Sequence, residues 1–266
     1  MLEVAKKAAY AAGKIITEHF KKLPKEAIRQ KQANDYLSFV DESSENTIIS
    51  IIHDYFPDHS ILAEEGGESN KPGEYRWIID PLDGTTNYIK ELPVFAISIA
   101  LQKGDEIILG VVYDPLQDEL FWAEKGKGAY VNDIPIQVSD SNSLSECLIA
   151  TGFPFKAKHL LRPYLNSFED MFHACIGIRR MGAAAIDIAY VAAGRFGGFW
   201  ELGLSPWDLA AGSVLIKEAG GKITDFWDNQ DYLFKNYLIV SNGHVHKQMG
   251  EIIRRYFPEY QTVYFK

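Results

Sequence analysis

The sequence predicts an α+β fold. Three apolar runs, 94–101, 107–114 and 119–123, are rich in β-branched and aromatic residues and are joined by short turns, which is typical of antiparallel strands. Helix-like patterns precede them over 2–20 and 41–55, and helices and strands alternate in the second half of the chain. With 266 residues, the chain is long enough for one large domain or two small ones.

The first half is predicted to start with two amphipathic helices and a short strand. Over 2–20, apolar residues recur every three or four positions with lysines between them. The second helix begins at Asp41, whose side chain is well placed to cap the helix N-terminus. The strand Ile61–Ala63 then leads directly into Glu64. A pair of glutamates before two glycines is typical of an exposed loop, but here it follows a strand end.

The second half is predicted to alternate helix and strand. Ser205 and Pro206 form a helix start, with the serine as N-cap and the proline in the first turn. This helix is apolar nearly all round, so we expect it to be buried. Asp208 lies in its first turn, where the helix dipole favours a carboxylate. The predicted helices are 160–172, 183–193, 206–218 and 245–256, and the predicted strands are 175–178, 196–200, 222–224 and 237–241.

The stretch Asp80–Asn87 carries the most specific pattern in the chain. The apolar run Trp77–Ile79 predicts a short buried strand, which should stop at Pro81 because proline cannot donate to a sheet ladder. Asp80 and Asp83 would then lie on a tight bend just past the strand. Asp-Pro and Asp-Gly are also common turn dipeptides, so two such aspartates alone are typical of a turn.

An anion site is predicted next to these carboxylates. Gly84 lets the backbone approach a ligand closely. The amides after it, with the hydroxyls of Thr85 and Thr86, can line an anion site, particularly if Thr85 begins a helix. Carboxylates beside bound phosphate are understandable if Mg²⁺ lies between them, since this ion takes a few carboxylates and phosphate oxygens. If strands 61–63 and 77–79 are neighbours, Glu64 joins the group.

Composition excludes some function classes. The formal net charge of -9 disfavours binding to nucleic acid or to an anionic membrane, both of which need a basic face. It also repels a phosphate substrate unless bound cations change the local charge. Only two cysteines are present and the N-terminal region lacks an unbroken apolar stretch. We therefore expect a reducing compartment, the cytoplasm, and neither a disulfide framework nor a membrane span.

Two loop segments bear on the organisation of the chain. The polar, serine-rich stretch 139–145 is the best candidate for a subdomain boundary near residue 142. It divides the chain into 1–142, with the main metal-binding motifs, and 143–266, which completes the metal and substrate site. Lys125–Gly128 has the composition of a basic phosphate loop, but no helix start follows it, so a hairpin turn is favoured.

Three blocks together resemble the inositol monophosphatase family of Mg²⁺-dependent, lithium-sensitive sugar phosphatases. They are Glu64-Glu65, Asp80–Asn87, and Glu201 with the run 207–221 that contains Asp208. The similarity extends from about residue 35 to 242. Gly182-Ala183-Ala184 aligns with a substrate-contacting turn, and Gly152-Phe153-Pro154 and Arg179–Gly182 are similar to bacterial members.

The resemblance implies a layered αβαβα sandwich, the fold shared with fructose-1,6-bisphosphatases, and a homodimer. It implies two or three Mg²⁺ ions per subunit, held by Glu64, Asp80, Asp83, Asp208 and the backbone carbonyl of Leu82. Four converging carboxylates cannot all stay ionised without cations, which agrees with this expectation. The phosphate would be held by Asp83, Gly84, Thr85 and Thr86, and the alcohol part of the substrate by Ala184, Glu201 and Asp208.

The implied reaction is hydrolysis by a metal-activated water. Glu64 and the Thr85 hydroxyl would orient and deprotonate the water, and Asp41 would accept a hydrogen bond from Thr85. The favoured substrate is myo-inositol monophosphate. Fructose 1,6-bisphosphate and 3′-phosphoadenosine phosphate are alternatives for the same chemistry. A regulatory binding protein in transcription or RNA processing is the alternative of another class, because bacterial relatives are linked to such roles.

Overall fold

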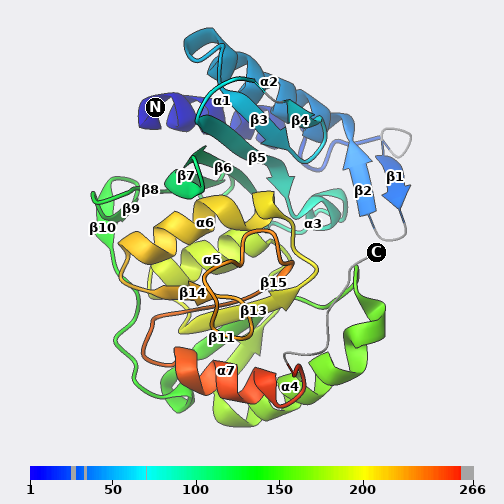
Figure 1. Cartoon of the computed structure of the whole chain (residues 1–266). Helices are drawn as coiled ribbons and strands as arrows, with labels where there is room; N and C mark the ends of the chain where they lie inside the picture. Colours follow the sequence, from blue (N-terminus) through cyan, green and yellow to red (C-terminus); the bar gives the residue numbers. More distant parts are fainter. Residues whose placement is uncertain (25–27, 33–34, 70, 259–266) are drawn as a thin grey trace.

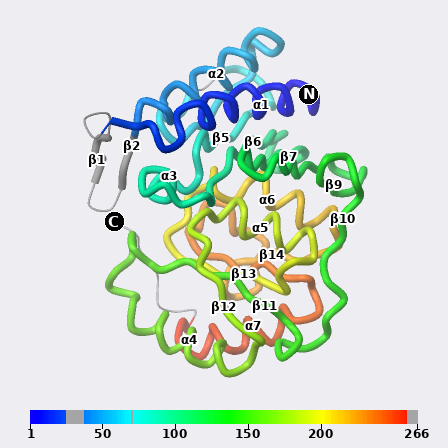
Figure 2. Tube along the Cα trace, turned by 180° about the vertical axis from the view of Figure 1, so that it is seen from behind, coloured from blue at the N-terminus to red at the C-terminus, as the bar shows by residue number. Residues whose placement is uncertain are grey.

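The chain forms five alternating layers of helices and sheets. The computed structural model describes residues 1–24, 28–32, 35–69 and 71–258 (Figure 1). A helix pair covers an eight-stranded sheet, a second helix pair separates this sheet from a five-stranded one, and a third pair covers the outer face (Figures 1 and 2). This arrangement confirms the expected αβαβα sandwich. The pairs are α1 (Leu2–His19) with α2 (Phe39–Tyr55), α5 (Ala184–Ala192) with α6 (Pro206–Glu218), and α4 (Leu161–Ala174) with α7 (His246–Arg254).

The eight-stranded sheet has the order β10-β9-β8-β7-β6-β5-β3-β4. Its neighbouring strands are antiparallel except β3 and β5, which run parallel with Ile61 opposite Trp77. Both the predicted antiparallel run and the predicted proximity of strands 61–63 and 77–79 are therefore confirmed. The strands are β3 (Ser60–Ala63), β4 (Gly67–Ser69), β5 (Tyr75–Asp83), β6 (Ala96–Lys103), β7 (Glu106–Asp114), β8 (Glu119–Glu124), β9 (Ala129–Val131) and β10 (Ile134–Ile136).

The five-stranded sheet has the order β12-β11-β13-β15-β14 and mixes both kinds of pairing. β11 is parallel to β12 and β13, whereas β15 is antiparallel to β13 and β14. Its strands are β11 (Leu148–Thr151), β12 (Gly177–Arg179), β13 (Gly198–Leu202), β14 (Lys222–Thr224) and β15 (Tyr237–Ser241). Short elements complete the chain: the hairpin β1 (Ile28–Gln32) and β2 (Asp35–Ser38), the helix α3 (Thr85–Ile89), and the 3₁₀ turns η2 (Leu144–Glu146) and η3 (Lys158–Leu160).

The central helix pair is buried between the two sheets, as the apolar sequence of α6 predicts. Leu209, Ala211 and Leu215 of α6 are fully buried. Small residues bring the layers close: a Cβ added at Gly110 of β7 would lie 2.4 Å from the carbonyl oxygen of Ala211. Since both sheets pack against this pair, side chains at the N-terminus of α6 lie next to the strand ends of the eight-stranded sheet.

Two local expectations were wrong. The second helix begins at Phe39, with Ser38 as N-cap, and Asp41 is the third helical residue. Its carboxylate accepts hydrogen bonds from the Ser38 amide at 2.9 Å and the Ser38 hydroxyl at 2.6 Å. The bond from the Ser38 amide, together with the Ser38 side chain accepting from the Asp41 amide, forms a capping box. Strand β5 continues past Pro81 to Asp83. Its register with β6 shifts between Asp80 and Asp83, so Pro81 lies in an irregular stretch and is not required as a ladder donor.

Three further expectations concern the cysteines, the segment Lys125–Gly128 and membrane-spanning helices. Both cysteines are free. Lys125–Gly128 is a turn between the antiparallel strands β8 and β9, and the amides of Gly126 and Gly128 bind the Glu218 carboxylate at 2.8 and 2.9 Å. Over the described ranges, every helix is too short or too polar to cross a membrane. The division near residue 142 stays a prediction.

Candidate metal and phosphate site

The irregular end of β5 positions two aspartates toward the central helix layer. The Asp80 carboxylate accepts a hydrogen bond from the Leu82 amide at 3.0 Å, which closes the bend around Pro81. The carbonyl of Pro81 in turn accepts from the Ser44 hydroxyl of α2 at 3.0 Å. Asp83 accepts from the amide of Ala185, in the first turn of α5, at 2.7 Å. The bend is therefore anchored to helices on both faces of the sheet.

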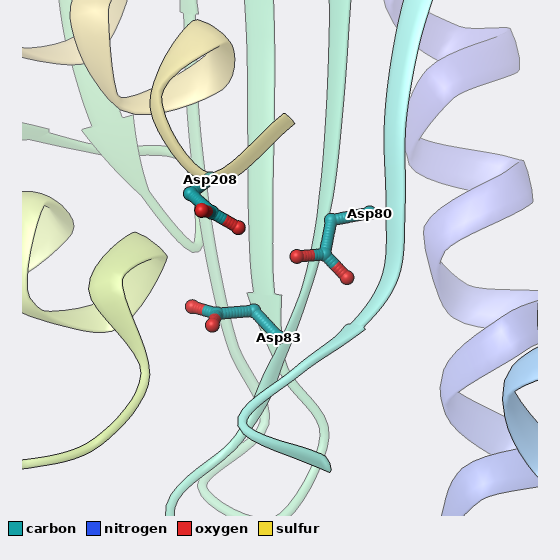
Figure 3. A group of neighbouring side chains, drawn as sticks. All are labelled: Asp80, Asp83 and Asp208. Atoms are coloured by element: carbon teal, nitrogen blue, oxygen red, sulfur yellow. The ribbon is translucent and has the colours of Figure 1, made fainter. Parts of the chain in front are cut away.

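A third aspartate comes from α6. Asp208 is the third residue of this helix, and its carboxylate accepts from the Ser205 amide at 2.7 Å in a second capping box. One carboxylate oxygen from each of Asp80, Asp83 and Asp208 lies within 4.8 Å of the other two. Figure 3 shows the three side chains converging on one point from β5 and from the N-terminus of α6. The capping role of Asp208 in α6 does not require its carboxylate to lie near Asp80 and Asp83.

Burial makes this group unstable as three separate anions. Burial raises the pKa of Asp80 well above its ordinary value, and the charges of Glu64, Asp83 and Asp208 raise it further. The pKa of Asp83 is raised well above its usual range by burial and by Asp208. The pKa of Asp208 is also raised, chiefly by burial. Such a group needs either protons or a bound cation, and clustered hard oxygen ligands fit Mg²⁺.

Glu64 and Leu82 lie beside this group. Glu64 follows β3, and its amide donates to the carbonyl of Ile79 at 3.2 Å, which fixes the strand end next to β5. Its carboxylate is close enough to raise the pKa of Asp80 but lies outside the three-aspartate group. The carbonyl of Leu82 accepts from the Thr85 hydroxyl at 3.0 Å. Both residues line the same cavity as the aspartates.

The turn after Asp83 presents backbone and hydroxyl donors. Gly84 has φ +93°, a left-handed conformation that favours glycine, and a Cβ there would lie 3.0 Å from the carbonyl oxygen of Val94. Thr85 begins α3, as predicted. Its hydroxyl lies 3.1 Å from Oδ1 of Asp41, so the contact expected between these residues exists. Asp41 is buried, and burial raises its pKa.

A cavity of about 600 Å³ brings almost all predicted site residues together. Asp41 is the exception, because it lies behind Thr85. The predicted residues that line the cavity are Glu64, Asp80, Leu82, Asp83, Gly84, Thr85, Thr86, Ala184, Glu201 and Asp208. They come from four separate elements, namely β3, β5 with α3, α5 and the β13–α6 segment. Their proximity is a property of the fold.

Glu201 of β13 is held against a glycine. A Cβ at Gly152 would lie 1.9 Å from the Glu201 carboxyl carbon, so any larger residue there would displace this side chain. Burial raises the pKa of Glu201 to about 8; the positive charges of Arg180 and Lys156 oppose this shift, and Asp208 adds to it. The carboxyl group is therefore poised between donating and accepting hydrogen bonds near neutral pH.

The structure adds Lys90 and Arg180 to the predicted site, and it places Phe155 and Lys156 in the cavity, as expected of the segment 153–158 from the sequence. The sequence signals for Lys90 and Arg180 were weak: a basic residue after the predicted anion site, and a pair of adjacent arginines at 179–180. Asp187 of α5 is buried, and its Oδ1 has no hydrogen-bond partner in the part of the chain that the structure covers. Burial, Glu201 and Asp83 raise its pKa well above the usual range. A lone charge in an apolar helix was its only signal.

Comparison with known proteins agrees with this geometry. The model of the inositol monophosphatase family matches residues 1–262 of the chain. The chain belongs to the inositol monophosphatase family. Its family membership and its structural neighbours indicate a phosphatase of the inositol monophosphatase superfamily.

Individual members of the family carry different names. A protein of Aquifex aeolicus named fructose-1,6-bisphosphatase/inositol-1-monophosphatase is 48% identical over 84% of each chain. The Nus factor SuhB of Escherichia coli K12 is 43% identical over 94% of each chain. The solved inositol monophosphatase of Anabaena sp. PCC 7120 is 39% identical and superposes with a TM-score of 0.86, covering 96% of this chain and 95% of that one.

Proposed function

We propose that the chain hydrolyses myo-inositol monophosphate to myo-inositol and phosphate in a Mg²⁺-dependent reaction. The observation that carries this proposal is the convergence of Asp80, Asp83 and Asp208, each of which places one carboxylate oxygen within 4.8 Å of the other two. Asp80 is buried, Asp83 and Asp208 are partly buried, and their charges repel one another. A structural role alone would not favour such a group, whereas two or three divalent cations would stabilise it.

The metal ligands in this proposal are Glu64, Asp80, Asp83, Asp208 and the carbonyl of Leu82. When bound, Mg²⁺ neutralises phosphate oxygens and lowers the pKa of an attacking water. The hydrogen bonds from Leu82 to Asp80 and from Ala185 to Asp83 orient the two β5 carboxylates before any ligand arrives. Such support keeps ligands in place and reduces the cost of reorganisation.

Thr85 and Asp41 form the proton path. The Thr85 hydroxyl has one proton, which it donates to the Asp41 carboxylate or the Leu82 carbonyl. Its oxygen therefore keeps lone pairs that can accept a hydrogen bond from water in the cavity. Thr85 Oγ1 would take a proton from this water while the hydroxyl proton of Thr85 passes to Asp41, which burial makes a stronger base than an exposed aspartate. Glu64 is proposed to orient the same water.

The substrate is held at both ends. The amides of Gly84 and Thr85, with the Thr86 side chain, are proposed to bind the phosphate. The Ala184 amide, Glu201 and Asp208 face the alcohol part of the substrate across the same cavity. Acceptors and a carboxyl group with a pKa of about 8 suit the hydroxyl groups of a polyol ring.

The test is phosphate release from a panel of esters, with Mg²⁺ and with chelator. The panel contains inositol 1-phosphate, fructose 1,6-bisphosphate, 3′-phosphoadenosine 5′-phosphate and glycerol 2-phosphate. Mg²⁺-dependent turnover led by inositol 1-phosphate supports the proposal. A different leading substrate keeps the mechanism and replaces the substrate. A folded, Mg²⁺-loaded protein that hydrolyses none of them contradicts the proposed activity.

The names of two relatives support further candidate functions. The name of the Aquifex aeolicus relative supports fructose 1,6-bisphosphate as a substrate of the same site. The Escherichia coli relative is named as a Nus factor, which supports a regulatory binding role in transcription. The net charge of -9 gives no support to direct nucleic-acid binding, so such a role would act through protein partners. A cytoplasmic homodimer, with a subdomain boundary near residue 142, completes the proposal.

A further inference from the structure

One face of helix α2 carries three polar side chains toward the sheet. Asp41, Ser44 and Glu45 are spaced as i, i+3 and i+4, which places them on the same side of the helix. All three side chains are buried. Since buried polar groups are almost always hydrogen-bonded, each of them needs a partner in the segment that it faces. Figure 1 shows this helix lying over the eight-stranded sheet, close to β3 and β5.

Their partners lie in the segments that carry proposed metal ligands. The Asp41 and Ser44 contacts, described above, reach the start of α3 and the bend of β5. Glu45 adds a third contact, because its Oε2 accepts a hydrogen bond from the backbone amide of Glu65 at 2.9 Å. Glu65 follows the proposed ligand Glu64 in the turn between β3 and β4. One helix face therefore holds the turn that carries Glu64 as well as the end of β5.

The β3–β4 turn stands at an exposed edge of the sheet. Residues 64–66 connect the two antiparallel strands, and β4 is three residues long, exposed along its whole length and last in the strand order. Such short edge elements bury little surface and open locally at low cost. The amide of Glu64 is held by the Ile79 carbonyl at 3.2 Å, on the side of β5. The Glu45 contact holds the next residue from α2, so the turn is fixed from two sides.

The turn is also shaped to admit the Glu45 carboxylate. Gly66 has no left-handed backbone conformation, so its backbone does not call for glycine. Space does, because a Cβ at Gly66 would lie 2.8 Å from Oε1 of Glu45. Both carboxylate oxygens of Glu45 thus lie against the turn, one at the Glu65 amide and the other at Gly66. Glu45 and the turn are therefore fitted to each other.

We infer that Glu45 is a positioning residue, which keeps the carboxylate of Glu64 at the metal site by holding the turn that carries it. The inference rests on the proposed function, in which Glu64 is a metal ligand and orients the attacking water. Glu45 does not itself line the cavity, so it acts through Glu65 and the turn. Residues that support a metal ligand in this way typically contribute about 10- to 100-fold to metal affinity or activity. Loss of Glu45 should therefore weaken Mg²⁺ binding while the three aspartates stay in place.

Two other roles of Glu45 make different predictions. A role in stability alone predicts a lower melting temperature in chelator, with unchanged Mg²⁺ affinity. A direct effect of its charge on the metal predicts that Glu45→Gln weakens Mg²⁺ binding as much as Glu45→Met does. Positioning predicts that the two variants differ, because glutamine keeps an oxygen that can accept from the Glu65 amide and methionine does not.

The binding test measures Mg²⁺ affinity by calorimetry on the whole protein, without substrate. We expect Glu45→Met to weaken Mg²⁺ binding about tenfold or more, and Glu45→Gln to stay close to the wild type. Glu42→Met is the matched control, because Glu42 is an exposed glutamate in the first turn of the same helix. The melting temperature of each variant in chelator measures any general loss of stability.

Gly66→Ala tests the same contact from the side of the turn. Its added Cβ should displace the Glu45 carboxylate and weaken Mg²⁺ binding, although no ionisable group is changed. Adding Glu45→Met to this variant should weaken binding little further, because both changes remove one interaction.

In turnover of inositol 1-phosphate, Glu45→Met and Gly66→Ala should lower kcat and leave KM nearly unchanged, since neither residue faces the substrate. The binding results support the inference even if no ester is hydrolysed, in which case only the proposed activity fails. Wild-type Mg²⁺ affinity in both variants would overturn the inference, as would equal losses of affinity in Glu45→Gln and Glu45→Met.

Discussion

The hydroxyl of Thr85 donates a hydrogen bond to the carboxylate of Asp41, with 3.1 Å between Oγ1 and Oδ1. The two residues lie 44 positions apart in the sequence and come from different helices. Asp41 also closes the capping box with Ser38, so one carboxylate both starts α2 and orients a hydroxyl at the cavity.

Replacement of Thr85 by valine tests this link. Valine keeps the shape of the side chain but removes the hydroxyl, so proton transfer from the attacking water should fail. We expect kcat to fall about 10²-fold or more, with a smaller change in KM, while stability falls by only about 1 kcal/mol. Thr85→Ser should retain most of the activity. Ser38→Ala is a second control, because it weakens the capping box and leaves the Thr85 hydroxyl in place. A valine variant with wild-type kcat would contradict the proton path.

Asp83→Asn separates the charge of this residue from its hydrogen bond. The asparagine oxygen can still accept from the Ala185 amide, which Asp83 does at 2.7 Å, so the fold should be preserved. Removal of one of three repelling carboxylates should raise the melting temperature of the chelated protein and nearly abolish Mg²⁺-dependent activity. The exposed turn residue Asp105 provides a matched control as Asp105→Asn. Full activity and full metal dependence in Asp83→Asn would refute the ligand assignment.

The same carboxylates predict a pH-dependent response to metal. Their pKa values are raised in the folded chain, so the folded state binds more protons than the unfolded state above the ordinary carboxyl range. The unfolding free energy of chelated protein should therefore fall as pH rises through those raised values. Urea unfolding at pH 6.5 and 8 should show this loss, and saturating Mg²⁺ should remove it. A Mg²⁺ effect that is absent at both pH values would contradict a cation site.

The local patterns predicted the fold and most of the cavity, because strand ends and helix starts are marked by residue type. The run Trp77–Ile79, followed by Pro81 and Gly84, indicates that the carboxylates of Asp80 and Asp83 lie at the end of β5. Ser205 and Pro206 likewise mark the start of α6. The local expectations that were wrong depend on contacts made in the folded chain. Asp41 is of a residue type that favours the N-cap position, but Ser38, three residues earlier, is the N-cap of α2. The sequence offers both residues, and the choice between them depends on how the helix packs.

The unpredicted residues are positioned by contacts between distant segments. The guanidinium carbon of Arg180 lies 5.9 Å from the ring centre of Phe153 and 5.7 Å from that of Phe155, which are about 25 residues away in sequence. Local spacing contains no information on that contact. Lys90 lines the cavity at the C-terminus of α3, a helix of about one and a half turns. The sequence contains no clear signal for where this helix ends. Resemblance to a family supplied the proposed metal ligands, whereas the positions of Lys90 and Arg180 in the cavity required the structure.

His246 gives a prediction about stability away from the site. It begins α7, and its ring nitrogens lie 2.9 Å from the hydroxyls of Thr224 and Ser241. Burial lowers its pKa to about 4. Between pH 6.5 and 4 the unfolded chain therefore binds a proton that the folded chain does not, and stability should fall as pH decreases. At about 1.4 kcal/mol per pKa unit, the loss is of order 3 kcal/mol.

Urea unfolding of His246→Gln should show a shallower loss between pH 6.5 and 4, because glutamine does not titrate. His244→Gln is the matched control, since His244 is exposed two residues earlier in the chain. That control should keep the wild-type slope. Identical slopes in the wild type and His246→Gln would show that His246 does not govern this pH range.

Gly152→Ala tests how the alcohol end of the substrate is held. The added Cβ would lie 1.9 to 2.0 Å from the carboxyl atoms of Glu201, so Glu201 must leave its place against β11. The three aspartates are not touched, and Mg²⁺ should still raise the melting temperature. We expect KM for inositol 1-phosphate to rise about tenfold, as for the loss of one strong hydrogen bond to a polyol. Gly177→Ala is the control, because its Cβ would meet Leu148 at an ordinary 3.5 Å. An unchanged KM in Gly152→Ala would exclude Glu201 from substrate binding and leave the metal ligands unaffected.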